Sequence, residues 1–243
     1  MTKITTREIL NTTEHRPWNV PEENWSFYQE WSDAIFLHYK VDINELKKFV
    51  PEALEIDLFD GIPWVSVVAF TMKKIRPKYV PAFSPISNFH EINVRTYVKS
   101  NNKCGVYFLS IEAGSSLSCK IAKGISELPY RYSKIKRTNN TYISQNSTYH
   151  DTLNLHYNVG KEQKEKTELD IWLTDRYALF QDTENFINAF EIHHLEWPIN
   201  NIELRYINVN YPRFKNLVHN KPNTTHYSKG VQVISWGKKK MEK

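Results

Sequence analysis

The segment Ser87–Val98 places a row of polar side chains along one face of a predicted strand. Side chains alternate between the two faces of a strand. Ile92, Val94, Thr96 and Val98 therefore share one face, and Glu91, Asn93, Arg95 and Tyr97 share the other. Glu91 and Arg95 would lie roughly 13 Å apart along this strand, too far to pair with each other. Each of the two must find a partner elsewhere in the fold or face a cavity.

The composition describes a folded chain of near-balanced charge. Aromatic residues make up 14% of the 243 residues, and there are only 7 glycines, which favours well-filled strands over disorder. The net charge is +5, of which the segment Gly237–Lys243, with four lysines and one glutamate, supplies +3 and leaves +2 for the rest. A nucleic-acid-binding domain is expected to carry a basic stripe on its folded part. We therefore expect no nucleic-acid partner.

The chain shows no sign of secretion or membrane insertion. Its two cysteines, Cys104 and Cys119, form no CxxC pair, which argues against a disulfide framework or a cysteine-based zinc site. The first ten residues contain no apolar signal core, and no apolar run reaches membrane-spanning length. We expect a cytoplasmic protein with no membrane partner.

The pattern of elements predicts an α+β fold with a mainly antiparallel sheet and a few short helices. Asp60-Gly61 lies between two apolar runs and predicts a hairpin. Three prolines predict a loop over Met72–Pro85, and apolar residues at intervals of four predict a helix within Glu112–Ser126. Further strands are expected near Tyr142–Ile143, Leu153–Val159, Leu169–Leu173, Ile192–Trp197, Ile202–Val209 and Val231–Trp236. We expect one domain over residues 15–236, a flexible lead-in over residues 1–14 and a flexible basic tail over residues 237–243.

The common catalytic motifs are absent. The sequence contains no P-loop, GxGxxG, HExxH or GxSxG motif. His193 and His194 are neighbours, so on a strand they would point to opposite faces and would not ligate one metal together. Arg176 lies in an apolar frame and must reach solvent or meet an acid such as Glu91, as a salt bridge or as part of a ligand clamp. We expect no metal and no cofactor.

Eight segments in order resemble the DUF2071 (YqjF-like) family of bacterial proteins. The matching segments are His15–Trp18, Leu58–Phe70, Phe89–Val98, Gly105–Ala113, Leu128–Tyr130, Leu173–Phe180, His193–Pro198 and His226–Trp236. The resemblance extends over nearly the whole chain. It implies an acetoacetate decarboxylase-like barrel with an internal ligand cavity, because the two families are similar at superfamily level.

The resemblance also implies a change in chemistry. The decarboxylase uses a lysine that forms a Schiff base, next to a second lysine that depresses its pKa. The corresponding positions here are Tyr130 and Arg131. Tyrosine cannot form an imine, and arginine stays protonated in proteins. We therefore expect the cavity without the Schiff-base mechanism.

The candidate ligand-binding residues suit a small anionic or oxygenated molecule. They are Glu91, Asn93, Arg95, Tyr97, Tyr130, Arg176 and His194. An arginine would clamp a carboxylate or enolate, and a tyrosine or histidine could act as acid or base. Two hypotheses stay open: an enzyme acting on a small carbonyl, carboxylate or aromatic compound, and a non-catalytic module that binds, sequesters or senses such a ligand. A homo-oligomer is compatible with either hypothesis.

Overall fold

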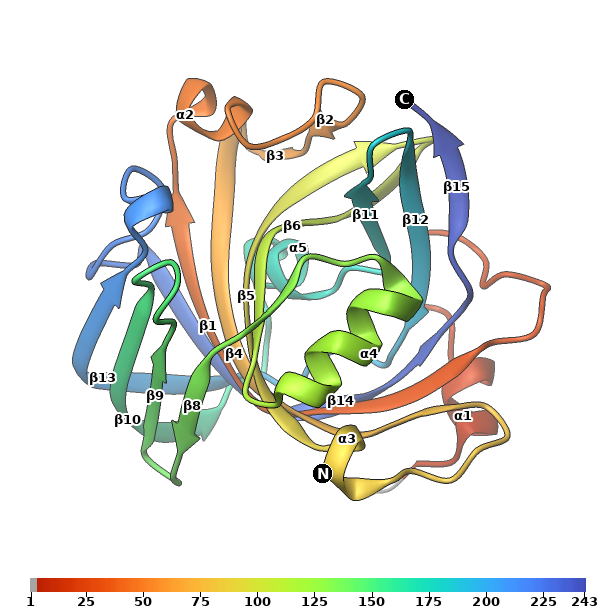
Figure 1. Ribbon diagram of the computed structural model, residues 1–243, viewed down its shortest axis with the longest axis horizontal. Coiled ribbons are helices and arrows are strands. Elements are labelled where there is room, and N and C mark those ends of the chain that lie inside the picture. The colour runs from red at the N-terminus through yellow and green to blue at the C-terminus, as the bar shows by residue number, and fades with distance from the viewer. Residues whose placement is uncertain (1–3) are drawn as a thin grey trace.

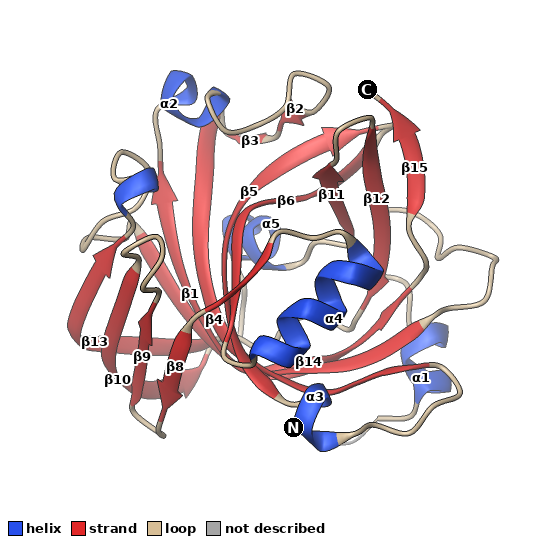
Figure 2. Ribbon diagram, viewed as in Figure 1, coloured by secondary structure: helices blue, strands red, loops and turns tan. Residues whose placement is uncertain are grey.

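A computed structural model describes residues 4–243, which form a large curled sheet with short helices at its edges (Figures 1 and 2). The strands are β1 (Phe27–Lys40), β2 (Glu55–Ile56), β3 (Leu58–Phe59), β4 (Ile62–Pro77), β5 (Phe89–Ser100), β6 (Lys103–Ala113), β7 (Tyr130–Tyr132), β8 (Lys134–Arg137), β9 (Thr141–Gln145), β10 (Thr152–Glu162), β11 (Ala178–Asp182), β12 (Phe186–His193), β13 (Asn200–Asn210), β14 (Thr224–Ser235) and β15 (Lys239–Glu242). The helices are α1 (Thr6–Asn11), α2 (Ile43–Lys47), α3 (Ser84–Ser87), α4 (Ser116–Ser126), α5 (Glu168–Thr174) and the 3-10 turn η1 (Pro212–Phe214). The predicted α+β class is confirmed. Among residues 4–243, no helix has the length and apolar character needed to cross a membrane.

Seven strands close into a barrel-like ring. The order β12-β11-β6-β5-β4-β1-β14 returns to its start because β14 also pairs with β12, through Ser235 opposite Ile192. Most pairs are antiparallel, whereas β6 and β11 run parallel. Gly105 on β6 permits that close approach, since a Cβ there would lie 2.6 Å from the carbonyl oxygen of Ala178. The ring encloses a space that α4 crosses in Figure 1.

A second group of strands, β13, β10, β9 and β8, continues from β14 and forms a wing beside the ring (Figure 1). The main apolar core fills the space between ring and wing. On β5, Ile92, Val94 and Val98 pack into this core together with Leu153 and Leu155 of β10. The alternation of strand side chains then directs Glu91, Asn93 and Arg95 toward the inside of the ring. The two faces predicted for this strand are thus packed on different sides of the sheet.

The predicted hairpin turn forms, and a side-chain cap starts helix α2. Asp60 and Gly61 both have positive φ, 50° and 76°, as a tight two-residue hairpin turn requires. At α2, the Asp42 side chain accepts hydrogen bonds from the backbone N–H groups of Asn44 and Glu45.

Three predicted segments differ from the structure. The Leu169–Leu173 stretch is helix α5 and not a strand, because Thr167 and Asp170 form a capping box at its start. The loop predicted over Met72–Pro85 is shorter, since β4 continues to Pro77 along β1, where Phe27 lies opposite Pro77. The strand predicted over Ile192–Trp197 ends at His193, where β12 ends.

Both ends of the chain carry more structure than the sequence predicted. In the lead-in, Thr5 caps α1 and Ile9 is fully buried in a small apolar cluster with Ile234 and Trp236. In the basic tail, Lys239–Glu242 forms β15, which pairs with β12. Burial of one apolar side chain in the lead-in and ladder hydrogen bonds in the tail give each end specific contacts with the ring.

Candidate functional site

A cavity of about 570 Å³ lies inside the ring. All seven ring strands contribute to its wall, and α4, β7 and the segment after α5 complete it. Aromatic and aliphatic side chains dominate the lining, including Trp31, Phe70, Phe108, Phe190 and Trp197. Six of the seven predicted site residues line this cavity: Glu91, Asn93, Arg95, Tyr130, Arg176 and His194. Segments that are far apart in sequence thus bring their polar groups to one apolar enclosure.

Glu91 is a buried carboxyl group with one hydroxyl donor. The Tyr130 hydroxyl donates a hydrogen bond of 3.0 Å to Glu91 Oε2. Burial raises the pKa of Glu91 to about 7, and the hydrogen bonds from Tyr130 and Asn93 only partly oppose this rise. The pKa of Tyr130 is raised well above its usual value, by burial and by the neighbouring carboxylate. Near neutral pH, Glu91 therefore populates both protonation states, while Tyr130 keeps its proton.

Arg95 is a buried cation without an acidic partner. Its side chain is only 7% exposed, and its Nη2 donates a hydrogen bond of 3.2 Å to the carbonyl oxygen of Leu173. Among residues 4–243, no carboxylate forms an ion pair with it, and its Nε has no hydrogen-bond partner. Burial lowers the pKa of Arg95, and the charge of Arg176 lowers it further. An arginine is rarely buried in this way unless it is paired.

Arg176 has the acid that Arg95 lacks, but this acid is not Glu91. Arg176 Nη1 lies 2.6 Å from Asp57 Oδ2, and its Nε donates to the carbonyl oxygen of Trp172 at 2.6 Å. Arg176 thus forms a salt bridge with an acid, one of the two predicted arrangements, but the acid is Asp57, which precedes the hairpin, and not Glu91. Nη2 of Arg176 has no partner among the described residues. Arg176 thus forms a structural ion pair and has one buried nitrogen without a partner among the described residues.

His194 is a neutral, buried imidazole among the lining residues. Its Nδ1 lies 2.7 Å from the carbonyl oxygen of Leu195, so Nδ1 carries the proton and donates. Burial lowers the pKa of His194 to about 4, which keeps the ring neutral. Nε2 then carries a lone pair with no hydrogen-bond partner in the described chain, and Oδ1 of Asn93 also lacks a partner there. Four lining residues (Asn93, Arg95, Arg176 and His194) thus each have one buried polar atom without a partner among the described residues, whereas buried polar atoms are normally satisfied.

Tyr97, the seventh predicted residue, does not line the cavity. Its ring packs on Trp172 with a centroid distance of 4.4 Å, and its hydroxyl donates to the carbonyl oxygen of Leu173. Along β5, the last residue that lines the cavity is Arg95. Tyr97 and Arg95 nevertheless share Leu173 as an acceptor. We assign Tyr97 a place beneath the site, where it helps to hold Arg95.

The two positions that correspond to the decarboxylase lysines point to opposite sides of β7. Tyr130 enters the cavity, whereas Arg131 turns away and pairs with Asp151 at 2.6 Å and Glu112 at 3.3 Å. The lysine among the described lining residues is Lys238, which lies at the exposed end and pairs with Glu127 at 2.5 Å. No described lysine therefore stands beside Glu91, where an imine-forming amine would be needed.

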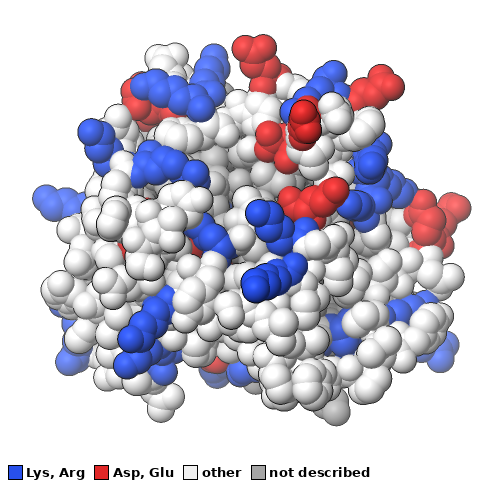
Figure 3. All heavy atoms as spheres, viewed as in Figure 1, with Lys and Arg blue, Asp and Glu red and all other residues white. Residues whose placement is uncertain are grey.

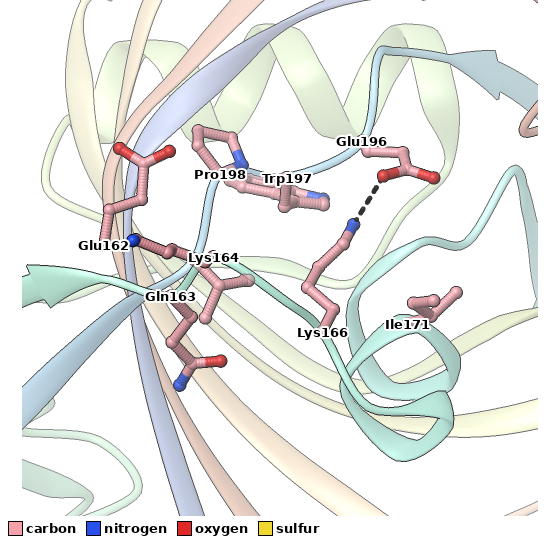
Figure 4. Close-up of a pocket in the computed structure, with 9 residues that line it drawn as sticks. Glu162, Gln163, Lys164, Lys166, Ile171, Glu196, Trp197 and Pro198 are labelled. Carbon is pink, nitrogen blue, oxygen red and sulfur yellow. Dashed lines mark ion pairs between the residues drawn. The ribbon is translucent and has the colours of Figure 1, made fainter.

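Sequence reasoning missed the helical side of the cavity. Ile121 and Ile125 of α4 line it, although they are 38% and 54% exposed. Their spacing predicted an amphipathic helix but not that its apolar face borders a cavity. Trp197 separates this cavity from a shallow surface hollow of about 380 Å³ (Figure 4). The ion pair of Lys166 with Glu196 at 3.0 Å crosses the surface hollow, so these two charged groups are already paired.

No metal centre is formed by the part of the chain that the structure describes: it brings no three His, Cys, Asp or Glu side chains together in a way that could hold an ion. His193 and His194 hydrogen-bond to different backbone carbonyls, of Ile9 and Leu195. On the face shown in Figure 3, basic and acidic side chains both occur among uncharged surface, and some of them lie next to each other.

The strands and the cavity define an α+β protein with a barrel-like ring of strands around an internal cavity. The sequence model of DUF2071, described as an uncharacterized conserved protein, matches residues 28–232. A relative from Bacillus subtilis (strain 168), the uncharacterized protein YqjF, is 32% identical over 228 residues, which cover 90% of this chain and 93% of YqjF. The chain belongs to the DUF2071 family.

Solved structures similar to this chain share its fold at low sequence identity. Acetoacetate decarboxylase from Legionella pneumophila superimposes with a TM-score of 0.61 at 13% identity, over 93% of each chain. The enduracididine biosynthesis enzyme MppR, complexed with the condensation product of pyruvate and imidazole 4-carboxaldehyde, gives a TM-score of 0.64 at 11% identity. That alignment covers 93% of this chain and 95% of MppR. The expected barrel class is confirmed by these neighbours.

Proposed function

We propose that the cavity binds a small organic acid with a carbonyl group, and that Glu91 exchanges a proton with the bound molecule. The observation that carries this proposal is Arg95, a buried cation with no acidic partner in the described chain. An unpaired buried charge is costly, whereas a guanidinium that meets a carboxylate forms strong charge-assisted hydrogen bonds. A carboxylate ligand would supply the missing acidic partner to the Arg95 guanidinium.

Glu91 supports the second half of the proposal. An acid–base group works best when its pKa lies near the working pH, and the pKa of Glu91 is about 7. In its ionised form, Glu91 would take a proton from the carbon beside the ligand carbonyl, which leaves an enolate. The cationic Arg95 would stabilise the enolate oxygen. Return of the proton from Glu91 to the same carbon closes the cycle with all atoms balanced.

The reaction class follows from what the site holds and lacks. Proton transfer next to a carbonyl needs a base and an oxyanion partner, and it needs no imine. The described cavity wall offers no lysine beside Glu91. MppR, a neighbour by fold alone, has been solved with pyruvate, a 2-oxo acid. A 2-oxo acid is therefore a reasonable first probe.

A second candidate function is binding without turnover. The hydrogen bond from Tyr130 to Glu91 favours it, because a phenol that keeps its proton holds Glu91 in a fixed donor–acceptor pair. In this case Arg95 would still anchor the anion. A sequestering or sensing module would need nothing more from the cavity.

The two functions are separated by proton exchange in D2O. We would incubate the protein with 2-oxo-4-phenylbutanoate and follow the C3 hydrogens by ¹H NMR. The proposal predicts exchange for deuterium well above the rate without protein, lost in Glu91→Gln, which should still bind the probe. Glu203→Gln, on the exposed wing strand β13, serves as the matched control. Binding without exchange would establish the non-catalytic alternative, and absence of binding would reject both.

A further inference from the structure

The cavity has polar side chains at its buried inner end and apolar side chains at its exposed outer side. Its polar residues are deeply buried: Glu91, Asn93 and Arg95 are 3%, 4% and 7% exposed. Its apolar residues on the outer side are open: Ile121 and Ile125 of α4 are 38% and 54% exposed. A ligand that satisfies both ends must therefore place its polar group innermost.

We infer that the ligand is an amphipathic carboxylate, with one acidic head and an apolar body longer than that of a three-carbon oxo acid. This inference rests on the proposed function, because it uses Arg95 as the anchor for the head. The geometry assigns the head to Arg95 and the body to the aromatic wall, with the far end of the body against α4.

The size of the cavity supports an extended body. Pockets of roughly 300–1,000 Å³ take drug-sized ligands, and this cavity measures about 570 Å³. A volume of ~30 Å³ per water corresponds to room for about twenty water molecules, several times what pyruvate would fill. A head group alone would leave the aromatic wall in contact with water.

The outer edge gives the second reason for an apolar tail. Val80, in the loop after β4, also lines the cavity and is 50% exposed. Together with Ile121 and Ile125 it forms an apolar rim on two separate elements. Two basic groups line the cavity near this edge. Lys238 pairs with Glu127, and Arg76 Nη1 donates to the backbone carbonyl oxygens of Pro77 and Lys78. The rim thus offers contact to hydrocarbon, and both basic groups already have hydrogen-bond partners.

The inference predicts a chain-length series. Calorimetric titration would compare butanoate, hexanoate, octanoate and decanoate. Burial of each added methylene is expected to tighten binding roughly three- to fourfold until the tail reaches solvent. Ile121→Glu should abolish the gain for the longer acids and leave butanoate unchanged. Ile143→Glu, 40% exposed on β9 and outside the cavity wall, is the matched control and should leave the series unchanged.

The possible outcomes separate this inference from the proposed function. Equal binding of all four acids, lost in Arg95→Met, would overturn the amphipathic ligand and leave the anion site standing. If decanoate and the uncharged decanol bind equally, and Arg95→Met changes neither affinity, both the amphipathic carboxylate ligand and the proposed anion site would be overturned. A length-dependent gain that requires both Arg95 and Ile121 is the result that supports the inference.

Discussion

His38 Nε2 lies 3.1 Å from Nδ1 of His226, and both imidazoles are buried in the sheet. On one side, His226 Nε2 lies 2.9 Å from Asp170 Oδ1. On the other side, His38 Nδ1 lies 2.6 Å from the Ser66 hydroxyl, which lies 2.6 Å from the Tyr97 hydroxyl. Four contacts thus connect α5 to the strand that carries Arg95.

The carboxylate of Asp170 fixes the direction of this chain, because it can only accept. His226 Nε2 therefore carries a proton and donates to Asp170. Burial lowers the pKa of both His38 and His226, so each ring is neutral at neutral pH and carries one proton. His226 Nδ1 then accepts from His38 Nε2, and His38 Nδ1 accepts from the Ser66 hydroxyl.

We therefore predict that His38 and His226 are both neutral at pH 7.5 and both protonated at Nε2. Long-range ¹H–¹⁵N correlation spectra of the imidazoles test this directly, since the two nitrogens differ strongly in shift when only one is protonated. Asp170→Asn should disturb both rings, because the amide can donate to His226 and so reverse the chain. An imidazolium pattern for either ring would contradict the prediction.

The stability of arginine variants should separate the ligand anchor from the structural ion pair. Arg95→Met removes an unpaired buried charge, so the free energy of unfolding should stay unchanged or rise by ~1–2 kcal/mol. Arg176→Met leaves Asp57 with only Lys99, at 3.0 Å, and should cost about 3 kcal/mol. Urea denaturation measures both. A loss for Arg95→Met as large as that for Arg176→Met would show that Arg95 is structural.

Glu91 should make the protein less stable above neutral pH. Its pKa rises from 4.5 in the unfolded chain to about 7 in the folded one. The stability it contributes is therefore full below pH 4.5 and is lost as the pH rises through 7. Glu91→Gln should gain up to ~3 kcal/mol relative to wild type between pH 5 and pH 8.5. Urea denaturation at several pH values would reveal the gain, and a pH-independent difference would refute it.

His194 should have the opposite effect. Burial lowers its pKa from 6.5 to about 4, so its stabilising contribution is full above pH 6.5 and is lost as the pH falls toward 4. His194→Asn retains a donor for the Leu195 carbonyl and cannot titrate. Between pH 6.5 and pH 4.5, we expect the free energy of unfolding of this variant to fall less steeply than that of wild type. The two slopes against pH should differ by at most the binding of one proton on unfolding. Parallel slopes for the two proteins would rule out a neutral buried His194.

The fold could be predicted where local patterns agreed with long-range packing. The alternation along Glu91–Tyr97 placed Ile92 and Val94 in one core and Glu91 and Arg95 on the other side of the sheet, as the structure shows. The prediction of a strand over Leu169–Leu173 was wrong because it used only the apolar residues of this run and not the helix start signal that precedes them. The Thr167–Asp170 capping box was legible in the sequence and indicates a helix.

The partners of the polar groups could not be predicted, because they depend on ring closure. Asp57 and Arg176 pair although they are 119 residues apart in the sequence, and nothing in the sequence around either residue predicts that pair. The end of the cavity at Arg95 is also a long-range property, since Trp172 covers Tyr97 from α5. Similarly, the exposed face of α4 carries a core-like pattern, and only the closed ring shows that this pattern borders a cavity.

The central claim is that Arg95 is an anion anchor, and calorimetric titration with 2-oxo-4-phenylbutanoate tests it most directly. We predict that wild type binds the acid, that its methyl ester binds at least tenfold more weakly, and that Arg95→Met removes the difference between acid and ester. Arg205→Met, an exposed arginine on β13, should behave as wild type. Equal affinity of wild type for acid and ester, or an acid preference that survives Arg95→Met, would contradict the claim.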